Sequence, residues 1–574
     1  MRVPFLGRLS ITEWSYILVS FTVAYTDAFL SLITSYLPTF IIDLCTSAVQ
    51  LAYHIVFKNL FVNYDARAHK YTYSTDMENS ITFEETQPPS PKTLTLPADF
   101  KKLSVNEAHK SIDLINCKTF EEMCHLRGFD VEEHIVKTSD NYLLTLHRLV
   151  RSPDADTTIS SQELRRRYGN RVVYLHHGLL MCSEIWVTML EEDKNLPFLL
   201  HKYGFDVWLG NNRGNKYSQK HLHYPSLSTK FWNFSLDEFA LFDIPETIDY
   251  ILKVTKVPKL TYIGFSQGTA QAFAAVSINP DLNDKLDQII AIAPAITPKG
   301  LHSKILDMFL KISPNVIYLI FSRKLLMPSV ILWNKIVYPP LFTNMIDRSN
   351  KLLFNWASKN ISPAQKVASY NHLYSPTLVK TVVHWFQIMA AKRFQMYHED
   401  ITSYAISPTQ YPINNIQVPI TLVYGDTDSL VDIKVMLSQL PRDNTEAIPV
   451  AGHEHLDMIW GADVDQLVFT HVIRKLFNNF ADKADFLLRT SESVHNFLSN
   501  GTFHSGLSLL GGKAMATTAI SDLGEDELEN SAILETDKLR ANSSLIERIE
   551  EVSNKKDLLE DGEVLRRRSH VGSL

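Results

Sequence analysis

The pentapeptide Gly264-Phe265-Ser266-Gln267-Gly268 is the part of this 574-residue sequence whose residue types most clearly suggest chemistry. An apolar run, 260–263, precedes it, and a run of mostly small residues, 269–275, follows it. This order is typical of a strand, a sharp turn and a helix, with glycine on both sides of the serine leaving room for close packing. The pattern predicts that the Ser266 hydroxyl projects from the top of a sheet, beside a helix N-terminus that favours developing negative charge.

A serine hydroxyl becomes an effective nucleophile when a base accepts its proton and a carboxylate holds that base in the correct tautomer. In hydrolases built around such a serine turn, the acid and then the base follow the serine along the chain, each on a loop after a strand. The sequence supplies two candidates for each role: Asp426 or Asp428 after the apolar run 420–425, and His453 or His455 further on. Chemistry alone does not choose within either pair.

Attack on an ester carbonyl produces an oxyanion, which needs backbone N–H donors. The residue after the nucleophile, Gln267, supplies one donor, and the loop after an early strand should supply the second. The apolar run 171–176 predicts that strand, and the Leu179 N–H in the loop after it is the candidate.

The sequence predicts no metal and no cofactor. His221 and His223 have the spacing of a zinc-binding pair, but no acidic or cysteine partner is evident, so we interpret them as surface histidines. No glycine-rich nucleotide-binding motif falls between an expected strand and an expected helix.

Strands alternate with helices from about residue 111 to 480, which predicts an α/β fold with a mostly parallel sheet covered on both faces. Between about 297 and 415 the rhythm breaks, and the segment 301–342 is unusually apolar. We interpret 297–415 as an inserted cap that covers the site in water and opens on lipid; a set of core helices is the alternative. The expected elements are two strands within 134–147, further strands at 171–176, 205–210, 260–263, 289–294 and 420–425, and a helix at 242–252.

The two ends of the chain differ from this central domain. Residues 1–60 are mostly apolar with basic residues on both flanks, which favours a hydrophobic membrane anchor that enters and leaves one face. The alternatives are a single spanning helix, interrupted by Asp27, a signal peptide, and a buried core hairpin. Residues 61–110 read as a polar linker, and 481–574 as a largely disordered tail. In the tail, Ser569 follows three arginines and is a candidate phosphorylation site.

Composition narrows the class of protein. The net charge is −7, and no dense basic stripe interleaved with aromatic residues is present, which argues against nucleic-acid binding. Only 4 cysteines occur, without a paired metal-binding or redox motif. A reduced, cytosol-facing domain is the simpler interpretation, with a single Cys117–Cys124 disulfide as the alternative.

Several stretches together resemble the acid-lipase family of α/β-hydrolases, which includes the gastric and lysosomal acid lipases and the fungal sterol esterases. The resemblance implies the α/β-hydrolase fold, selects Asp428 and His455 over their neighbours, and implies Leu179 and Gln267 as oxyanion donors. Residues 4–12 and the apolar segment after them are similar to the lipid-droplet sterol esterases of fungi. Besides the serine pentapeptide, the matching stretches are 141–148, 177–180, 206–215, 231–239 and 455–461.

The resemblance implies a serine esterase that cleaves steryl esters at the surface of lipid droplets and the endoplasmic reticulum membrane, with its catalytic domain facing the cytosol. Acylglycerols are the alternative substrates, and an inactive lipid-surface scaffold is the alternative function. The anchor and the tail depart from the secreted lipases, so a luminal location and an acidic optimum are not expected.

Overall fold

The computed structural model describes residues 11–36, 105–151, 171–298, 304–326, 339–399 and 408–477, with a few single positions between 41 and 48 and between 330 and 337. The chain divides into two units, Met1–Glu492 and Ser493–Leu574, and every described residue belongs to the first. The predicted tail with Ser569, and most of the predicted linker, lie outside the described residues.

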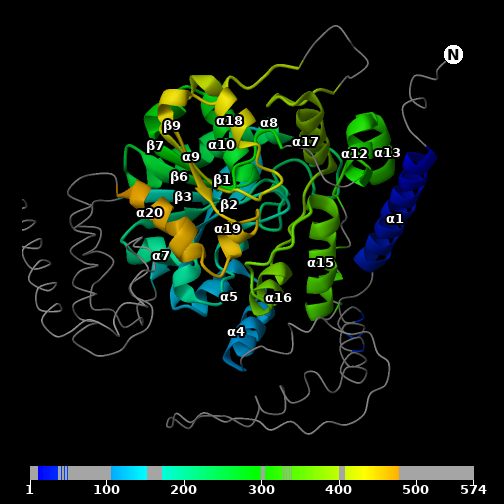
Figure 1. The fold of residues 1–574 in the computed structure, drawn as a ribbon, viewed down its shortest axis with the longest axis horizontal. Coiled ribbons are helices and arrows are strands. Elements are labelled where there is room, and N and C mark those ends of the chain that lie inside the picture. The colour runs from blue at the N-terminus through cyan, green and yellow to red at the C-terminus, as the bar shows by residue number, and fades with distance from the viewer. Residues whose placement is uncertain are drawn as a thin grey trace, which may run out of the picture. The chain divides into compact units, whose positions relative to one another are not determined.

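A nine-stranded sheet runs through the first unit in the order β1-β2-β4-β3-β6-β7-β8-β9, with β5 paired to β2 (Figure 1). Strand β2 is antiparallel to its three partners, and from β4 to β9 every neighbouring pair is parallel. The mostly parallel α/β sheet predicted from the sequence is therefore confirmed. The strands are β1 (Phe129–Lys137), β2 (Tyr142–Arg151), β3 (Val172–His176), β4 (Asp206–Leu209), β5 (Lys220–His221), β6 (Leu260–Phe265), β7 (Leu286–Ile292), β8 (Ile420–Gly425) and β9 (Thr445–Val450).

The central strands are short apolar runs because helices cover both of their faces. Every residue of β3 and β6 is buried, as expected for parallel strands inside an α/β domain. Helices α9 and α10 pack into one hydrophobic cluster with the sheet, and α7 and α20 into the other. The helices outside the insertion and the N-terminal segment are α4 (Val105–Asn116), α5 (Phe120–His125), α7 (Leu196–Lys202), α8 (Leu236–Glu238), α9 (Ile244–Thr255), α10 (Gln267–Ile278), α11 (Leu282–Lys285), α18 (Ile433–Gln439), α19 (Asp457–Trp460) and α20 (Thr470–Leu476).

Between β7 and β8 the chain leaves the sheet, where the sequence predicted an inserted cap. Helices α12, α13 and α17 pack around a third cluster that includes Met308, Ile317 and Val383. In the part of the insertion that the structure describes, the helices are α12 (Lys304–Lys311), α13 (Pro314–Phe321), α15 (Pro339–Phe354), α16 (Pro363–Asn371) and α17 (Val379–Ala391).

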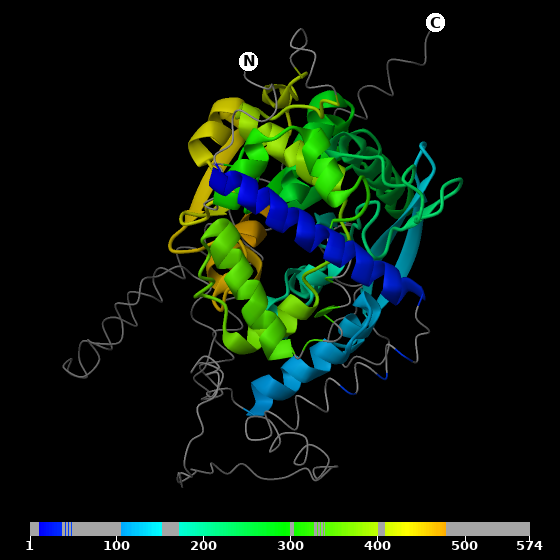
Figure 2. The ribbon, with the colours of Figure 1, turned by 90° about the vertical axis from the view of Figure 1, so that its right-hand side faces the viewer.

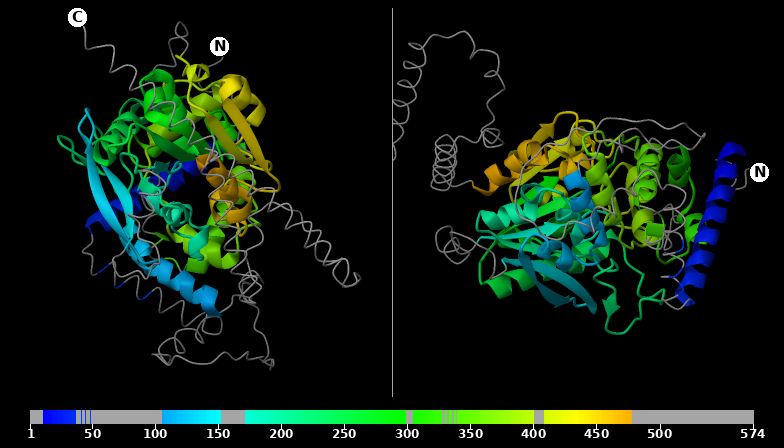
Figure 3. Two further views of the ribbon diagram at one scale, coloured as in Figure 1. Left: turned by 90° about the vertical axis from the view of Figure 1, so that its left-hand side faces the viewer. Right: turned by 90° about the horizontal axis from the view of Figure 1, so that it is seen from below.

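Helix α1 (Ile11–Tyr36), within the predicted anchor, packs along α12 and α13 of the cap (Figures 2 and 3). Tyr16 and Ala24 contact the third cluster, the Glu13 carboxylate pairs with Lys311 at 2.7 Å, and Asp27 is buried. Among the described residues, no helix combines the length and apolar character needed to cross a bilayer. The large apolar side chains of α1 that are more than half exposed are Leu18, Val19, Val23, Tyr25, Phe29 and Leu32.

Helix α4 corrects one predicted boundary. The linker was expected to extend to residue 110, but α4 begins at Val105. It packs on α16, with Leu114 fully buried and the Ser111 hydroxyl donating to the Ala364 carbonyl at 3.3 Å. The polar composition of this stretch predicted a linker, because the helix is stabilised by contacts with cap residues that are distant in the sequence.

Candidate active site

Ser266 stands at a strained turn between β6 and α10. Its backbone has φ 53° and ψ −121°, a conformation that residues other than glycine rarely adopt. The Ser266 N–H donates to the Ile292 carbonyl at 3.0 Å, and its carbonyl accepts from the Thr269 N–H at 3.0 Å, which hold the strained residue in place. The side chain therefore points away from the sheet at the start of a helix, as the pentapeptide predicted.

The glycines around Ser266 are required by close packing. A Cβ atom on Gly264 would lie 2.8 Å from the Thr269 nitrogen, and one on Gly268 would lie 2.6 Å from the His176 carbonyl oxygen. Gly178, in the loop after β3, lies against the serine itself, since a Cβ there would be 3.0 Å from the Ser266 Cβ. Only glycine lets the turn, its helix and the β3 loop approach this closely.

Ser266, His455 and Asp428 form a continuous hydrogen-bonded chain. The His455 Nε2 lies 2.8 Å from the Ser266 Oγ, and the His455 Nδ1 lies 2.6 Å from the Asp428 Oδ2. The second Asp428 oxygen accepts from the Leu430 N–H at 2.9 Å. All three side chains are buried, so the imidazole has a fixed donor on one side and a fixed acceptor on the other. This arrangement can move a proton from the hydroxyl to the imidazole while the carboxylate stabilises the resulting positive charge.

The side chains of Asp426 and His453, the alternative candidates, bond to groups other than Ser266, His455 and Asp428. The Asp426 carboxylate accepts from the Gly452 N–H at 2.7 Å, joining the loops after β8 and β9. The His453 ring lies 3.0 Å from both the Ala451 carbonyl and the Asp463 carboxylate. The structure therefore brings Asp428 and His455, but neither alternative, to Ser266.

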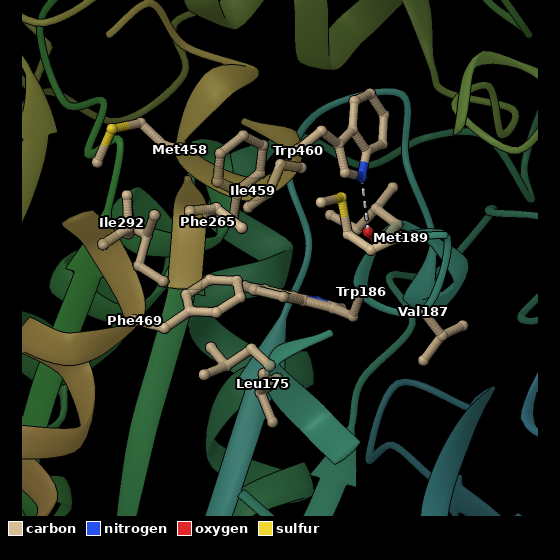
Figure 4. Packing of buried hydrophobic residues seen from close by; sticks show 14 of the residues in the cluster. Leu175, Trp186, Val187, Met189, Phe265, Ile292, Met458, Ile459, Trp460 and Phe469 are labelled. Atoms are coloured by element: carbon tan, nitrogen blue, oxygen red, sulfur yellow. Dashed lines mark hydrogen bonds between the residues drawn. The ribbon is translucent and has the colours of Figure 1, made fainter. Parts of the chain in front are cut away.

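The His455 loop and the serine strand are anchored in one hydrophobic cluster (Figure 4). Helix α19 begins two residues after His455, and its Trp460 Nε1–H donates to the Ile185 carbonyl at 3.1 Å. Phe265, which precedes Ser266, belongs to the same cluster and contacts the Trp186 ring. The nucleophile and the base are thus held by shared packing, which fixes their separation.

The two predicted oxyanion donors lie on elements that border Ser266. Gln267 is the first residue of α10, so its N–H belongs to the helix end that lacks intrahelical acceptors. Leu179 follows Gly178 in the loop that lies against the serine. Their role as donors stays a prediction.

A neutral histidine fixes the loop that carries Leu179. The His177 Nε2 accepts from the Asn212 N–H at 3.1 Å, so Nδ1 carries the proton and donates to the Gly178 carbonyl at 2.8 Å. Burial lowers the pKa of His177 to about 4, which keeps the ring uncharged at neutral pH. From the sequence, His177 was singled out only within the stretch 177–180 that resembles the acid-lipase family.

Comparisons with known proteins identify the family of this chain. A family model described as alpha/beta hydrolase fold matches residues 171–462, and one described as partial alpha/beta-hydrolase lipase region matches 120–190. A "Probable lipase" of Schizosaccharomyces pombe is 46% identical over 379 residues, covering 65% of this chain and 83% of that protein. The chain belongs to the acid-lipase family of α/β-hydrolases.

Vertebrate acid lipases are also similar to this chain. The gastric triacylglycerol lipase of Mus musculus is 31% identical, covering 60% of this chain and 88% of that lipase. A "Putative lysosomal acid lipase/cholesteryl ester hydrolase" of Crotalus adamanteus is 31% identical, covering 64% of this chain and 92% of that protein. As a member of this family, the chain is a carboxylic ester hydrolase.

The stretch 206–215, one of those that resemble the acid-lipase family, forms a buried polar network beside the site. Arg213 is fully buried and pairs with Asp243 at 2.6 Å and also with Asp140. Burial raises the pKa of Asp243 to about 6, although the Arg213 guanidinium opposes the rise. The network holds the loop whose Asn212 supports His177.

His221 and the buried cysteines make no metal site among the described residues. The His221 Nδ1 accepts from the N–H groups of His223 and Tyr224 at 2.9 and 3.0 Å. Across the described ranges, no group of three or more His, Cys, Asp or Glu side chains is arranged to hold a metal ion. Cys117 and Cys124 are separate buried thiols, and burial raises the pKa of Cys117 to about 11.

Two cap residues that sequence reasoning missed reach into this acid-lipase site. The Trp385 Nε1–H, from α17, donates to the Gln267 side-chain oxygen at 2.7 Å. Trp356 stacks on the His455 ring. Each contact joins residues about a hundred positions apart, and neither tryptophan has a local motif that could have identified it.

Proposed function

We propose that this chain hydrolyses steryl esters through Ser266, His455 and Asp428, by way of an acyl-enzyme. The observation that carries the proposal is the hydrogen-bonded chain from the Ser266 hydroxyl through the His455 ring to the Asp428 carboxylate. Ser266 attacks the acyl carbonyl carbon while the His455 Nε2 takes the hydroxyl proton. The Leu179 and Gln267 N–H groups stabilise the negative charge that develops on the carbonyl oxygen.

Collapse of the tetrahedral intermediate breaks the bond to the alcohol. His455 returns its proton to the departing sterol alkoxide, and the acyl group remains on the Ser266 oxygen. A water molecule then attacks the acyl carbonyl while His455 takes a proton from it. The fatty acid leaves, and the proton returns to Ser266.

The steryl ester is proposed from the relatives and from the amino-terminal resemblance. The relative from Crotalus adamanteus carries cholesteryl ester hydrolase in its name, and the first residues are similar to fungal sterol esterases. Acylglycerols are the second candidate, because the relative from Mus musculus is named a triacylglycerol lipase. A scaffold without activity is disfavoured by the complete and hydrogen-bonded Ser, His and Asp set.

We expect purified full-length protein to hydrolyse emulsified cholesteryl oleate faster than emulsified triolein. Ser266→Ala is the matched control and should hydrolyse neither, because it lacks the attacking oxygen. The measurement is fatty-acid release from each emulsion at equal surface area. Faster release from triolein would favour the acylglycerol alternative, no release from either would favour the scaffold, and full release by Ser266→Ala would exclude the proposed nucleophile.

We also propose that the chain works at a lipid surface, the lipid droplet and the cytosolic face of the endoplasmic reticulum, with α1 as an interfacial helix and the cap as a lid. Helix α1 packs one face on the cap and exposes apolar side chains on the other, such as Leu18, 68% exposed, and Phe29, 61% exposed. A helix that presents an apolar face to solvent can lie in the plane of a lipid surface with that face buried.

We expect the combined change Leu18→Ser, Phe21→Ser and Phe29→Ser to release full-length protein from phospholipid-coated triolein droplets. Fully burying each such side chain is worth about 1.5–3 kcal/mol, at least about 4.5 kcal/mol for the three, so binding should weaken by about 1,000-fold or more. The measurement is flotation with the droplets. The control, Thr22→Ala with Thr26→Ala, alters exposed side chains that bond only to their own helix backbone, and it should float normally. Unchanged flotation of the triple variant would place the attachment outside α1.

A further inference from the structure

Trp356, from the cap, covers one face of the His455 imidazole. The two rings are nearly parallel, with centroids 5.1 Å apart and an interplanar angle of 7°. Phe265 contacts the same imidazole from a second direction, with centroids 5.1 Å apart and an angle of 47°. His455 is therefore enclosed by aromatic rings, and its side chain is 3% exposed.

Stacking constrains a motion that the two hydrogen bonds leave open. The bonds to Ser266 and Asp428 end on Nε2 and Nδ1, so together they fix an axis that lies in the plane of the ring. Rotation of the ring about that axis tilts its plane while lengthening neither bond appreciably. A flat indole against the face of the ring opposes this tilt.

The loop that carries Trp356 is tied to the loop of the acid. The Trp356 Nε1–H donates to the Ser429 Oγ at 3.1 Å, and the Ser429 hydroxyl donates to the Phe354 carbonyl at 2.8 Å. Ser429 follows Asp428 directly. Phe354 stacks on the indole with centroids 4.3 Å apart. The Ser429 bond therefore holds the edge of the indole, and Phe354 holds one of its faces.

The same loop is tied to the loop of the base. The Glu454 carboxylate, next to His455, accepts from the N–H groups of Ala357 and Ser358 at 2.7–3.0 Å. Further along, the Asn360 side chain donates to the Gly452 carbonyl at 2.8 Å. Residues 354–360 thus join the Asp428 loop to the His455 loop.

Backbone strain lies on both sides of the tryptophan. Asn355 has φ 61° and Ser358 has φ 46°, in the left-handed region that favours glycine. Strain of this kind persists where surrounding contacts determine the conformation, and it is common at functional sites. Here the Ser358 N–H donates to the Glu454 carboxylate. The two neighbours of Asn355, Phe354 and Trp356, are bonded to Ser429.

We propose that Trp356 is a positioning residue that holds the His455 imidazole in the plane required for proton transfer, through its stack on the ring and the ties of residues 354–360 to both catalytic loops. This inference rests on the proposed roles of Ser266, His455 and Asp428. It makes the cap part of the catalytic apparatus as well as a cover. The residue acts through His455 and takes no part in the bonds that form or break.

The test uses full-length protein and p-nitrophenyl butyrate, a small soluble ester whose concentration is set independently of any lipid surface. Trp356→Leu should lower kcat by about 10-fold to 100-fold with KM little changed, because a small misplacement of a catalytic group has effects of this size. Trp356→Phe keeps a flat ring and should restore kcat to within about 3-fold of the parent, since most of the stacking surface remains. Trp333→Leu, at a cap tryptophan that is 41% exposed, is the control and should leave kcat unchanged.

Ser429→Ala is a second variant, and unlike Trp356→Leu it leaves the tryptophan side chain in place. It removes the hydrogen bond that holds the indole edge, and it should lower kcat by a smaller factor, about 3-fold to 10-fold. Thermal unfolding of each variant shows whether it is folded. Parental kcat in folded Trp356→Leu, or in Ser429→Ala if Trp356→Leu does not fold, would overturn the inference. Turnover by Ser266→Ala would instead overturn the proposed function.

Discussion

Replacing His455 by alanine should reduce kcat for p-nitrophenyl butyrate by about 10⁵-fold to 10⁶-fold, the loss typical when the base of a serine hydrolase is removed. The His455 Nε2 lies 2.8 Å from the Ser266 Oγ, with Asp428 on the other side of the ring. Without this base the hydroxyl keeps its proton and attacks poorly. Labelling of Ser266 by a fluorophosphonate should also slow strongly, because it needs the same activated oxygen.

His453→Gln is the matched control for this prediction. His453 is two residues away and equally buried, but its ring faces the Ala451 carbonyl and the Asp463 carboxylate. Its replacement should lower the melting temperature while kcat and the labelling of Ser266 stay close to those of the parent. A large loss of kcat in folded His453→Gln, with little loss in His455→Ala, would show that the base is assigned to the wrong histidine.

The sequence predicted the parts of the site that local patterns determine. Glycines at 264 and 268, around a serine between an apolar run and small residues, were enough to predict the strained turn, since these residue types mark it locally, although contacts from β7 and the loop after β3 also surround it. The short apolar runs likewise predicted the buried strands of the parallel sheet. Residue types alone left Asp426 and Asp428 equivalent, because both lie on one loop and only the folded backbone decides which carboxylate faces His455.

The contacts that the sequence did not predict are made across long separations. Trp356 meets His455 from a cap helix-to-helix loop, and α4 depends on Ala364 of the cap. The apolar run at the amino terminus was interpreted as a membrane anchor, with a spanning helix among the alternatives, and Asp27 counted against the spanning helix. In the structure Asp27 is buried, and α1 packs on the cap, so the run combines a packing face with an exposed apolar face.

Replacing Asp428 by asparagine should reduce kcat by about 10⁴-fold while KM changes little, as expected when the acid of a catalytic triad is made neutral. The carboxylate accepts the His455 Nδ1–H at 2.6 Å, which leaves Nε2 free to accept the Ser266 proton. An asparagine amide can donate to Nδ1 instead and so favour the opposite tautomer, in which Nε2 already carries a proton. The measurement is kcat and KM on p-nitrophenyl butyrate.

Asp426→Asn is the control, because it makes the same chemical change two residues earlier. Its side chain is exposed, and an asparagine oxygen can still accept from the Gly452 N–H as the carboxylate does at 2.7 Å. The variant therefore loses one negative charge near the site but keeps the bond between the loops, and its kcat should stay within about 3-fold of the parent, since an exposed charge is well screened by solvent. Equal losses in the two variants would attribute the effect to net charge, whereas a loss confined to Asp428→Asn requires the directed bond to His455.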